Sequence, residues 1–258
     1  MPSIRPNELF KEAFRAVGQH LPAVAIYLAV TLTGSILYVI VRTLAPAGDD
    51  PPATAALAPW IAWMLDVMMA ALGALAATLA FSRMGRELDK PLWKVEGDGE
   101  ALRRFFLPWF MLWLATITIN RWLISAAAQS EDPGLAILVL LVYFGLAMLV
   151  VPVGACIMFT REFSWHLLGE SLAPLGRQFA YAFGFFLFGF AVYLFLMTTA
   201  ISYPHQPNLA SREGLIATAL YAVLDILGGY SDCVIFAGIW LVCRLDRDTV
   251  REDDDFDF

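Results

Sequence analysis

Six long apolar stretches dominate this sequence and constrain its fold more than any other feature. A helix needs about 20 mostly apolar residues to cross the bilayer core, and each stretch reaches that length. Segments that cross lipid must satisfy their own backbone hydrogen bonds, so these stretches are predicted to be α-helices. The six predicted spans cover residues 21–43, 57–82, 105–127, 134–158, 179–202 and 214–243.

The composition leaves little room for a separate soluble domain. Hydrophobic residues make up 59% of the 258 residues and charged residues only 16%, against about 45–50% and about 25% in soluble domains. We therefore expect one all-α integral membrane domain over residues 1–245, followed by an acidic tail over residues 246–258. The first stretch is longer than the core of a cleaved signal peptide, so we expect a retained helix.

Lysine and arginine positions predict how the helices are oriented. Fourteen of the 17 basic residues lie before the first span, between the second and third, between the fourth and fifth, or after the sixth. Basic residues favour the cytoplasmic side. Both termini are therefore predicted to be cytoplasmic, in a multi-pass protein of the bacterial inner membrane. Five or seven helices would break this alternation.

Three short amphipathic segments, 7–18, 98–106 and 164–178, precede the odd-numbered spans. Each is predicted to form a cytoplasmic interfacial helix that lies among the lipid head groups. Asn7 is a predicted N-cap of the first, and Pro174 is predicted to interrupt or bend the third. Similar Glu-containing sequences in the three segments suggest three repeats of an interfacial helix followed by a transmembrane hairpin.

The tail carries seven acidic residues among its last thirteen. It has too few apolar residues to fold alone, so we expect a solvated, disordered end. The alternative is a docking tail for a basic partner.

Two parts of the chain resemble a pattern in bacterial six-helix membrane proteins of unknown function. They are FSRMGRELDKPLW with the following EALRRFFLPW, and FTREFSWHLLGESLAPLGRQFAYAFGFF after the fourth span. This group includes the membrane domain that precedes some glycerophosphodiester phosphodiesterases. The resemblance implies a six-helix architecture. No phosphodiesterase domain accompanies the pattern in this sequence, so that activity is not implied.

Polar residues inside the predicted spans are candidates for function, because ionisable groups are costly in a membrane. Arg121 is predicted to pair with Asp66, which lies at a similar depth at 1.5 Å per residue, and Asp225 is the competing partner. Such a pair would either lock helices together or belong to a proton or substrate pathway. The candidate intramembrane polar site comprises Asp66, Asn120, Arg121, Asp225 and Asp232.

The sixth predicted span contains Gly228 and Gly229 between its two aspartates. Glycine pairs break some transporter helices and expose backbone groups that bind ions or substrates. Glycine also permits close helix contacts. The pair is therefore a candidate helix break that serves tight packing, with an ion or substrate site as the alternative.

The fifth span is aromatic on all sides. Phe183, Phe186 and Phe190 are the candidate contacts with a partner helix, and lipid is the alternative neighbour.

The sequence contains no recognisable catalytic, metal or nucleotide-binding motif, and its three cysteines lack ligand-like spacing. We expect no enzymatic activity, no cofactor and no nucleic-acid partner. The expected partners are the lipid bilayer and other membrane proteins. The leading hypothesis is an accessory, assembly or scaffold subunit of a larger membrane protein complex. The alternative is a small transporter or lipid-handling protein that uses the intramembrane Asp and Arg residues.

Overall fold

The computed structural model describes residues 6–44, 54–88, 97–128, 133–160, 168–203, 207 and 209–255. Within this part of the chain every regular element is an α-helix. The helices are α1 (Pro6–Gln19), α2 (Leu21–Leu44), α3 (Thr54–Leu88), α4 (Asp98–Ala128), α5 (Pro133–Thr160), α6 (Leu168–Arg177), α7 (Phe179–Ser202) and α8 (Arg212–Asp255).

Five of these helices are long and apolar enough to cross a membrane, so the chain is an all-helical, multi-pass membrane protein. The candidate spans are Leu21–Val41, Trp63–Leu88, Asp98–Leu123, Phe179–Ala200 and Arg212–Thr249. The remaining predicted span, 134–158, falls in α5, where the described side chains give a shorter apolar helix, Met148–Thr160. Six spans therefore remain a prediction.

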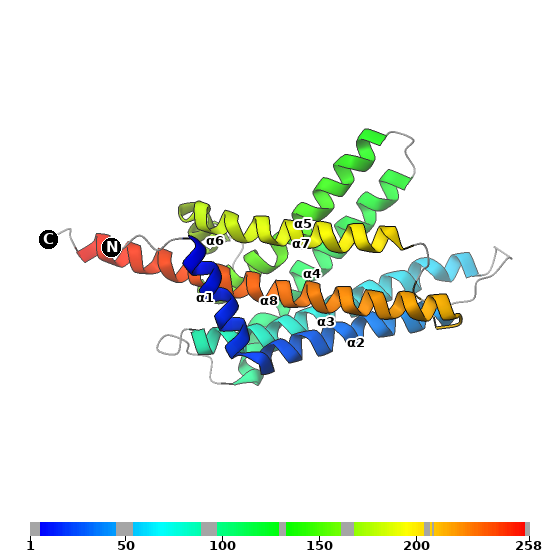
Figure 1. Ribbon diagram of the computed structural model, residues 1–258, viewed down its shortest axis with the longest axis horizontal. Coiled ribbons are helices and arrows are strands. Elements are labelled where there is room, and N and C mark those ends of the chain that lie inside the picture. The colour runs from blue at the N-terminus through cyan, green and yellow to red at the C-terminus, as the bar shows by residue number, and fades with distance from the viewer. Residues whose placement is uncertain are drawn as a thin grey trace.

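Helix α8 is the centre of the packing. It contacts α1, α2, α3, α5, α6 and α7, and all its residues from 231 to 243 are buried. In Figure 1, α2, α3, α7 and α8 run along the long axis, while α1 crosses one end of them and the outer parts of α4 and α5 tilt away. The start of α1 and the end of α8 lie at the same end of the molecule in this view.

Stacked rings fill the middle of the bundle. We call Tyr27, Phe81, Trp109, Phe236 and Trp240 the aromatic core. The Phe81 ring lies 4.9 Å from Tyr27, 5.4 Å from Trp109 and 4.2 Å from Phe236. All five side chains are at most 2% exposed. The core thus joins α2, α3, α4 and α8 by offset stacking of large apolar groups.

Two glycines make room for large rings, one inside the aromatic core and one outside it. A Cβ atom at Gly154 would overlap the ring of Trp109, and one at Gly238 would overlap the ring of Phe185. The Trp109 indole also donates a hydrogen bond to the sulfur of Met158 at 3.2 Å. Helix α5 therefore approaches α4, and α8 approaches α7, only because these two positions lack side chains.

Helix α1 matches the predicted amphipathic segment 7–18, but its apolar face packs mainly on protein. Leu9, Ala13 and Val17 are at most 4% exposed, and α1 contacts α8 as well as α2, α3 and α7. Asn7 lies inside the helix, which begins at Pro6, so the predicted N-cap is wrong.

The second amphipathic segment differs from prediction, whereas the third is helical as predicted. Residues 98–106 form the first turns of α4 and not a separate interfacial helix, so the proposed three-part repeat is wrong in its second part. The third segment is helical as α6, which continues through Pro174 to Arg177. Residues 164–167 lie outside the described residues.

The predicted break at Gly228 and Gly229 is also wrong, because α8 runs without interruption from Arg212 to Asp255. A Cβ atom at Gly229 would lie 2.7 Å from Leu28, and one at Gly228 would lie 3.3 Å from Leu196. The pair therefore lies in close packing against α2 and α7, as the packing interpretation expects, but without a break in the helix. The same helix continues into the acidic segment, whose backbone is helical through Asp255 where we had expected disorder.

Candidate functional site

A cavity of about 520 Å³ lies between α2, α3, α4, α7 and α8. We call it the intramembrane cavity. Its walls are mostly apolar, and its volume is typical of small-molecule sites. It is lined by Tyr27, Thr31, Gly34, Ser35, Met69, Leu72, Gly73, Trp113, Ile117, Tyr193, Leu196, Met197, Ala200, Tyr221, Leu224, Asp225, Gly228, Gly229 and Asp232.

Two carboxyl groups from α8 line this cavity at different depths. Asp225 and Asp232 are seven residues apart, which is two helical turns, or about 10 Å along the axis. Asp232 is 7% exposed and accepts a hydrogen bond from the Tyr27 hydroxyl at 2.9 Å. Asp225 accepts a hydrogen bond from the Ser35 hydroxyl. Both acids are thus held by hydroxyl groups of α2.

Among the described residues of the lining there is no lysine or arginine to neutralise these acids. It does contain Trp113, whose indole nitrogen is buried and has no hydrogen-bond partner among the described residues. The cavity therefore presents acidic groups and an N–H donor on an apolar background.

A second cavity of about 340 Å³ adjoins the first and shares Ser35, Met69, Tyr221 and Asp225 with it. It extends past Tyr38 and Val39 to Pro207, in the connection between α7 and α8. Beyond Asp232 in the other direction, α8 enters its fully buried stretch and the aromatic core. The two cavities thus extend from Asp232 toward the α7–α8 connection, and the aromatic core closes the opposite end.

The predicted polar residues separate into two groups. Asp225, Asp232, Gly228 and Gly229 line the intramembrane cavity together. Asp66 and Arg121 instead form an ion pair between α3 and α4, with 2.6 Å between the carboxylate and the guanidinium. Arg121 therefore pairs with Asp66 and not with the competing Asp225.

Asn120 joins neither group. It is 9% exposed, and its side-chain oxygen is buried without a hydrogen-bond partner among the described residues. We have no physical account of this buried amide.

The three candidate contact residues of α7 do not all face outward. Phe183 is 45% exposed and Phe190 is 37% exposed, whereas Phe186 packs against the hydrophobic core. Phe185, which lies between them, is buried and stacks on Phe10 of α1 with ring centroids 4.3 Å apart. Helix α7 therefore has one face on the bundle and one exposed aromatic face.

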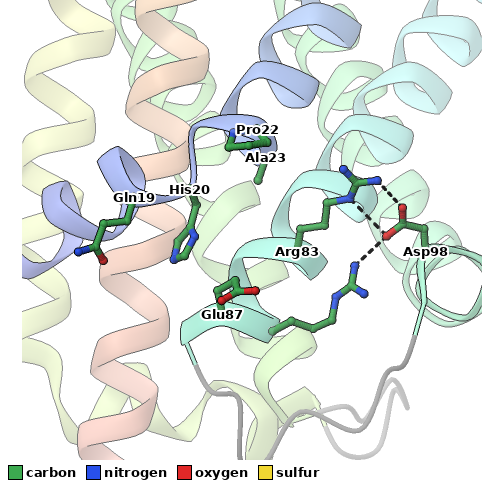
Figure 2. Close-up of a pocket in the computed structure, with 8 residues that line it drawn as sticks. Gln19, His20, Pro22, Ala23, Arg83, Glu87 and Asp98 are labelled. Carbon is green, nitrogen blue, oxygen red and sulfur yellow. Dashed lines mark hydrogen bonds and ion pairs between the residues drawn. The ribbon is translucent and has the colours of Figure 1, made fainter.

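A third hollow lies at the end of the bundle where α1 meets α2, and sequence reasoning missed it. We call it the interfacial cleft. It has a volume of about 620 Å³ and is lined by Gln19, His20, Pro22, Ala23, Arg83, Arg86, Glu87 and Asp98. Figure 2 shows Arg83 reaching toward Asp98, with His20 and Glu87 on the other side of Arg83 in this view.

Asp98 binds both arginines of the cleft. Arg83 donates to its two carboxylate oxygens through Nε at 3.3 Å and Nη2 at 2.5 Å, and Arg86 donates through Nη2 at 2.7 Å. In the sequence, Arg83 and Arg86 bear only on the predicted orientation of the helices. The contact between the end of α3 and the start of α4 could not be derived from their spacing.

Another ion pair, between Arg177 and Asp246, joins α6 to α8. Arg177 donates to the two carboxylate oxygens of Asp246 at 2.9 and 2.6 Å, and the Asp246 side chain is only 3% exposed. These hydrogen bonds raise the pKa of the Arg177 guanidinium above its usual value. Asp246, the first residue of the predicted acidic tail, is therefore part of the packed domain.

Among the described residues, no group of three or more His, Cys, Asp and Glu side chains could hold a metal ion. No known family model, curated protein or solved structure matches this chain. The resemblance to the membrane domain of some phosphodiesterases therefore stays a prediction.

Proposed function

We propose that this protein takes up a small hydrophobic molecule that carries a cationic group, and holds it in the intramembrane cavity as a transporter or lipid-handling protein. One observation carries the proposal: Asp225 and Asp232 line one mostly apolar cavity, and none of the described residues in its lining is basic.

Carboxyl groups are energetically costly at membrane depth. Ionisable side chains in a membrane face a cavity or pair with one another. Here both acids face the cavity, and their partners among the described residues are the hydroxyl groups of Tyr27 and Ser35. A bound cation would supply the missing opposite charge, where weak screening strengthens the attraction. The apolar walls contributed by Leu72, Ile117 and Leu196 would hold the rest of the molecule.

The arrangement of the cavities favours loading from one end. The second cavity leads from Asp225 to Pro207, while stacked rings fill the bundle beyond Asp232. With the six predicted spans and the distribution of basic residues, the Pro207 end would face away from the cytoplasm. The protein would thus be a bacterial inner-membrane protein with cytoplasmic termini, and the hydrophobic cation would enter its cavity from the outer side.

The test is binding of tetraphenylphosphonium, a rigid hydrophobic cation, to the purified protein in detergent, measured by equilibrium dialysis. Asp225→Asn and Asp232→Asn should each weaken binding by about tenfold or more, which is about 1.4 kcal/mol. Asp248→Asn is the matched control, because it is the same substitution at an exposed position of the same helix.

Tetraphenylborate, which has similar size and opposite charge, is the matched control for the ligand. The proposal predicts that it binds no better to the wild type than to the Asp225 variant. Equal affinity for both ions, or an unchanged affinity for the cation in both cavity variants, would overturn the proposal. Uptake by proteoliposomes then separates a transporter from a protein that only holds the molecule.

The exposed face of α7 supports a second candidate, the accessory subunit of a larger membrane complex. Phe179, Phe183 and Phe190 are 59%, 45% and 37% exposed and follow one side of the helix. Aromatic side chains are common anchors of protein interfaces. The candidate partner would be a membrane helix that packs along this face.

Mass spectrometry of the tagged protein, purified in mild detergent from its native membrane, tests this candidate. A partner in fixed stoichiometry should be lost when Phe183 and Phe190 are replaced by Ala. It should be retained in Leu138→Ala, which changes an exposed residue of α5. A protein that purifies alone would rule out the accessory role.

A further inference from the structure

The interfacial cleft lies where three candidate membrane spans end. The α2 span begins at Leu21, the α3 span ends at Leu88, and the α4 span begins at Asp98. The cleft is lined by residues at or beside each of these three positions. With these span ends, its polar groups would lie near the boundary between lipid head groups and acyl chains.

One side of the cleft carries two arginines whose geometry suits a phosphate group. Arg83 and Arg86 are 41% and 27% exposed, and one carboxylate, Asp98, fixes both guanidinium groups. A guanidinium has five N–H donors, of which Asp98 occupies two on Arg83 and one on Arg86. The remaining N–H donors of the two arginines are held in place, and the three side chains together carry one positive charge. Such an arrangement suits bidentate binding of phosphate oxygens by a planar guanidinium.

A second acid changes the kind of ligand that the cleft fits. Glu87 follows Arg86 directly and also lines the cleft, and Figure 2 shows it nearer to His20 than to Asp98. With Glu87 included, the two arginines and two acids have no net charge. The site therefore favours a zwitterion over a purely anionic group.

The remaining wall is apolar. Pro22 and Ala23 line the cleft at the start of α2, beside the helix surface that enters the membrane. A lipid whose head group occupies the cleft would place the first carbons of its chains along this wall.

We infer that the interfacial cleft binds the head group of phosphatidylethanolamine, with the phosphate on Arg83 and Arg86 and the ammonium on Glu87. The ammonium of this lipid donates hydrogen bonds to a carboxylate, which the trimethylated ammonium of phosphatidylcholine does not. Phosphatidylglycerol has no positive group for Glu87. This inference is independent of the ligand proposed for the intramembrane cavity.

Native mass spectrometry tests the inference on the full chain, after equilibration with equal amounts of phosphatidylethanolamine, phosphatidylcholine and phosphatidylglycerol. The wild type should retain phosphatidylethanolamine in preference to both others. Arg86→Gln should lower retention of all three lipids by about tenfold. Glu87→Gln should leave lipid retained but abolish the preference for phosphatidylethanolamine over phosphatidylcholine.

Arg103→Gln is the matched control, since Arg103 is an exposed arginine near the start of α4 outside the cleft. Retention by Arg86→Gln equal to that by the control would overturn the inference, as would a wild type without preference among the lipids. Should Arg86→Gln lower the melting temperature, Glu87→Gln decides alone, because Glu87 is exposed and glutamine keeps the length and shape of its side chain.

Glycerophosphoethanolamine, which has the same head group and no acyl chains, distinguishes a lipid from a soluble source. The inference predicts that it displaces the retained lipid only at large excess. Displacement at equal concentration would show that the cleft binds the free head group, and would overturn the assignment to a membrane lipid.

Discussion

Tyr27 of α2 donates a hydrogen bond to the Oδ2 atom of Asp232 in α8 at 2.9 Å, and this bond joins two residues 205 positions apart. The tyrosine ring is also part of the aromatic core, where it stacks on Phe81. One side chain therefore connects the Asp232 end of the intramembrane cavity with the aromatic core.

Removal of that hydroxyl should destabilise the protein. Tyr27→Phe keeps the ring but leaves the buried Asp232 carboxyl without its donor, which costs about 1–3 kcal/mol. Thermal unfolding in detergent should show a lower melting temperature than for the wild type. Tyr38→Phe is the control, because Tyr38 is 42% exposed. Equal melting temperatures for the two variants would contradict the role assigned to this hydrogen bond.

The packing of α5 on α4 should be sensitive to a single methyl group. Gly154→Ala places a Cβ atom where the Trp109 ring lies, so α5 must shift, and overpacking of this kind costs about 1–3 kcal/mol. Gly145→Ala is the matched control in the same helix, because among the described residues no atom of a neighbouring element lies within 4 Å of its Cβ position. The control should unfold at or above the wild-type temperature, since alanine favours helix. A Gly154→Ala protein as stable as the control would argue against this contact.

The ion pair between α3 and α4 should behave as a coupled unit. Arg121→Gln leaves Asp66, which is 14% exposed, without its partner in an apolar setting. The double variant Asp66→Asn with Arg121→Gln removes the isolated charge and should recover part of the lost stability. A double-mutant cycle on melting curves should give a coupling free energy of about 0.5–3 kcal/mol. Additive effects would mean that the two side chains do not interact in the membrane.

The contact of α6 with α8 should depend on Arg177. Arg177→Gln leaves the buried Asp246 carboxylate without its guanidinium, so α6 should dissociate from α8 more often. Hydrogen exchange should become faster at the amides of α6 and unchanged in α2. Arg244→Gln, which replaces an exposed arginine of α8, should leave exchange in α6 as in the wild type. Protection of α6 in both variants would contradict the role of this pair.

The sequence was sufficient to predict the helices that apolar length defines. The first predicted span, 21–43, differs by one residue at its end from α2, and the fifth, 179–202, coincides with α7. The Asp66–Arg121 pair was also predictable, because equal depth in two neighbouring spans leaves few other partners. Such features depend on local composition and on the thickness of the membrane.

Two of the errors have different physical origins. Gly228 and Gly229 look like a helix break in isolation, but close packing against Leu28 and Leu196 of other helices decides their role. Residues 98–106 look amphipathic alone, yet they continue into α4 because no residue there ends the helix.

The intramembrane cavity could be predicted in part. Asp225 and Asp232 were identifiable as polar residues two turns apart, whereas Tyr27 and Ser35 come from a helix whose neighbour was unknown. The interfacial cleft was not predictable, because Arg83 and Glu87 resemble any charged end of a membrane helix. Only the meeting of α2, α3 and α4 makes them one site.

The length of α8 has a geometric consequence. Its 44 residues extend over about 66 Å at 1.5 Å per residue, roughly twice the thickness of the bilayer core. The stretch from 231 to 243 is held on all sides by the bundle. Because α8 is continuous to Asp255, its last turns extend beyond the bilayer core on the same uninterrupted helix that carries Asp232.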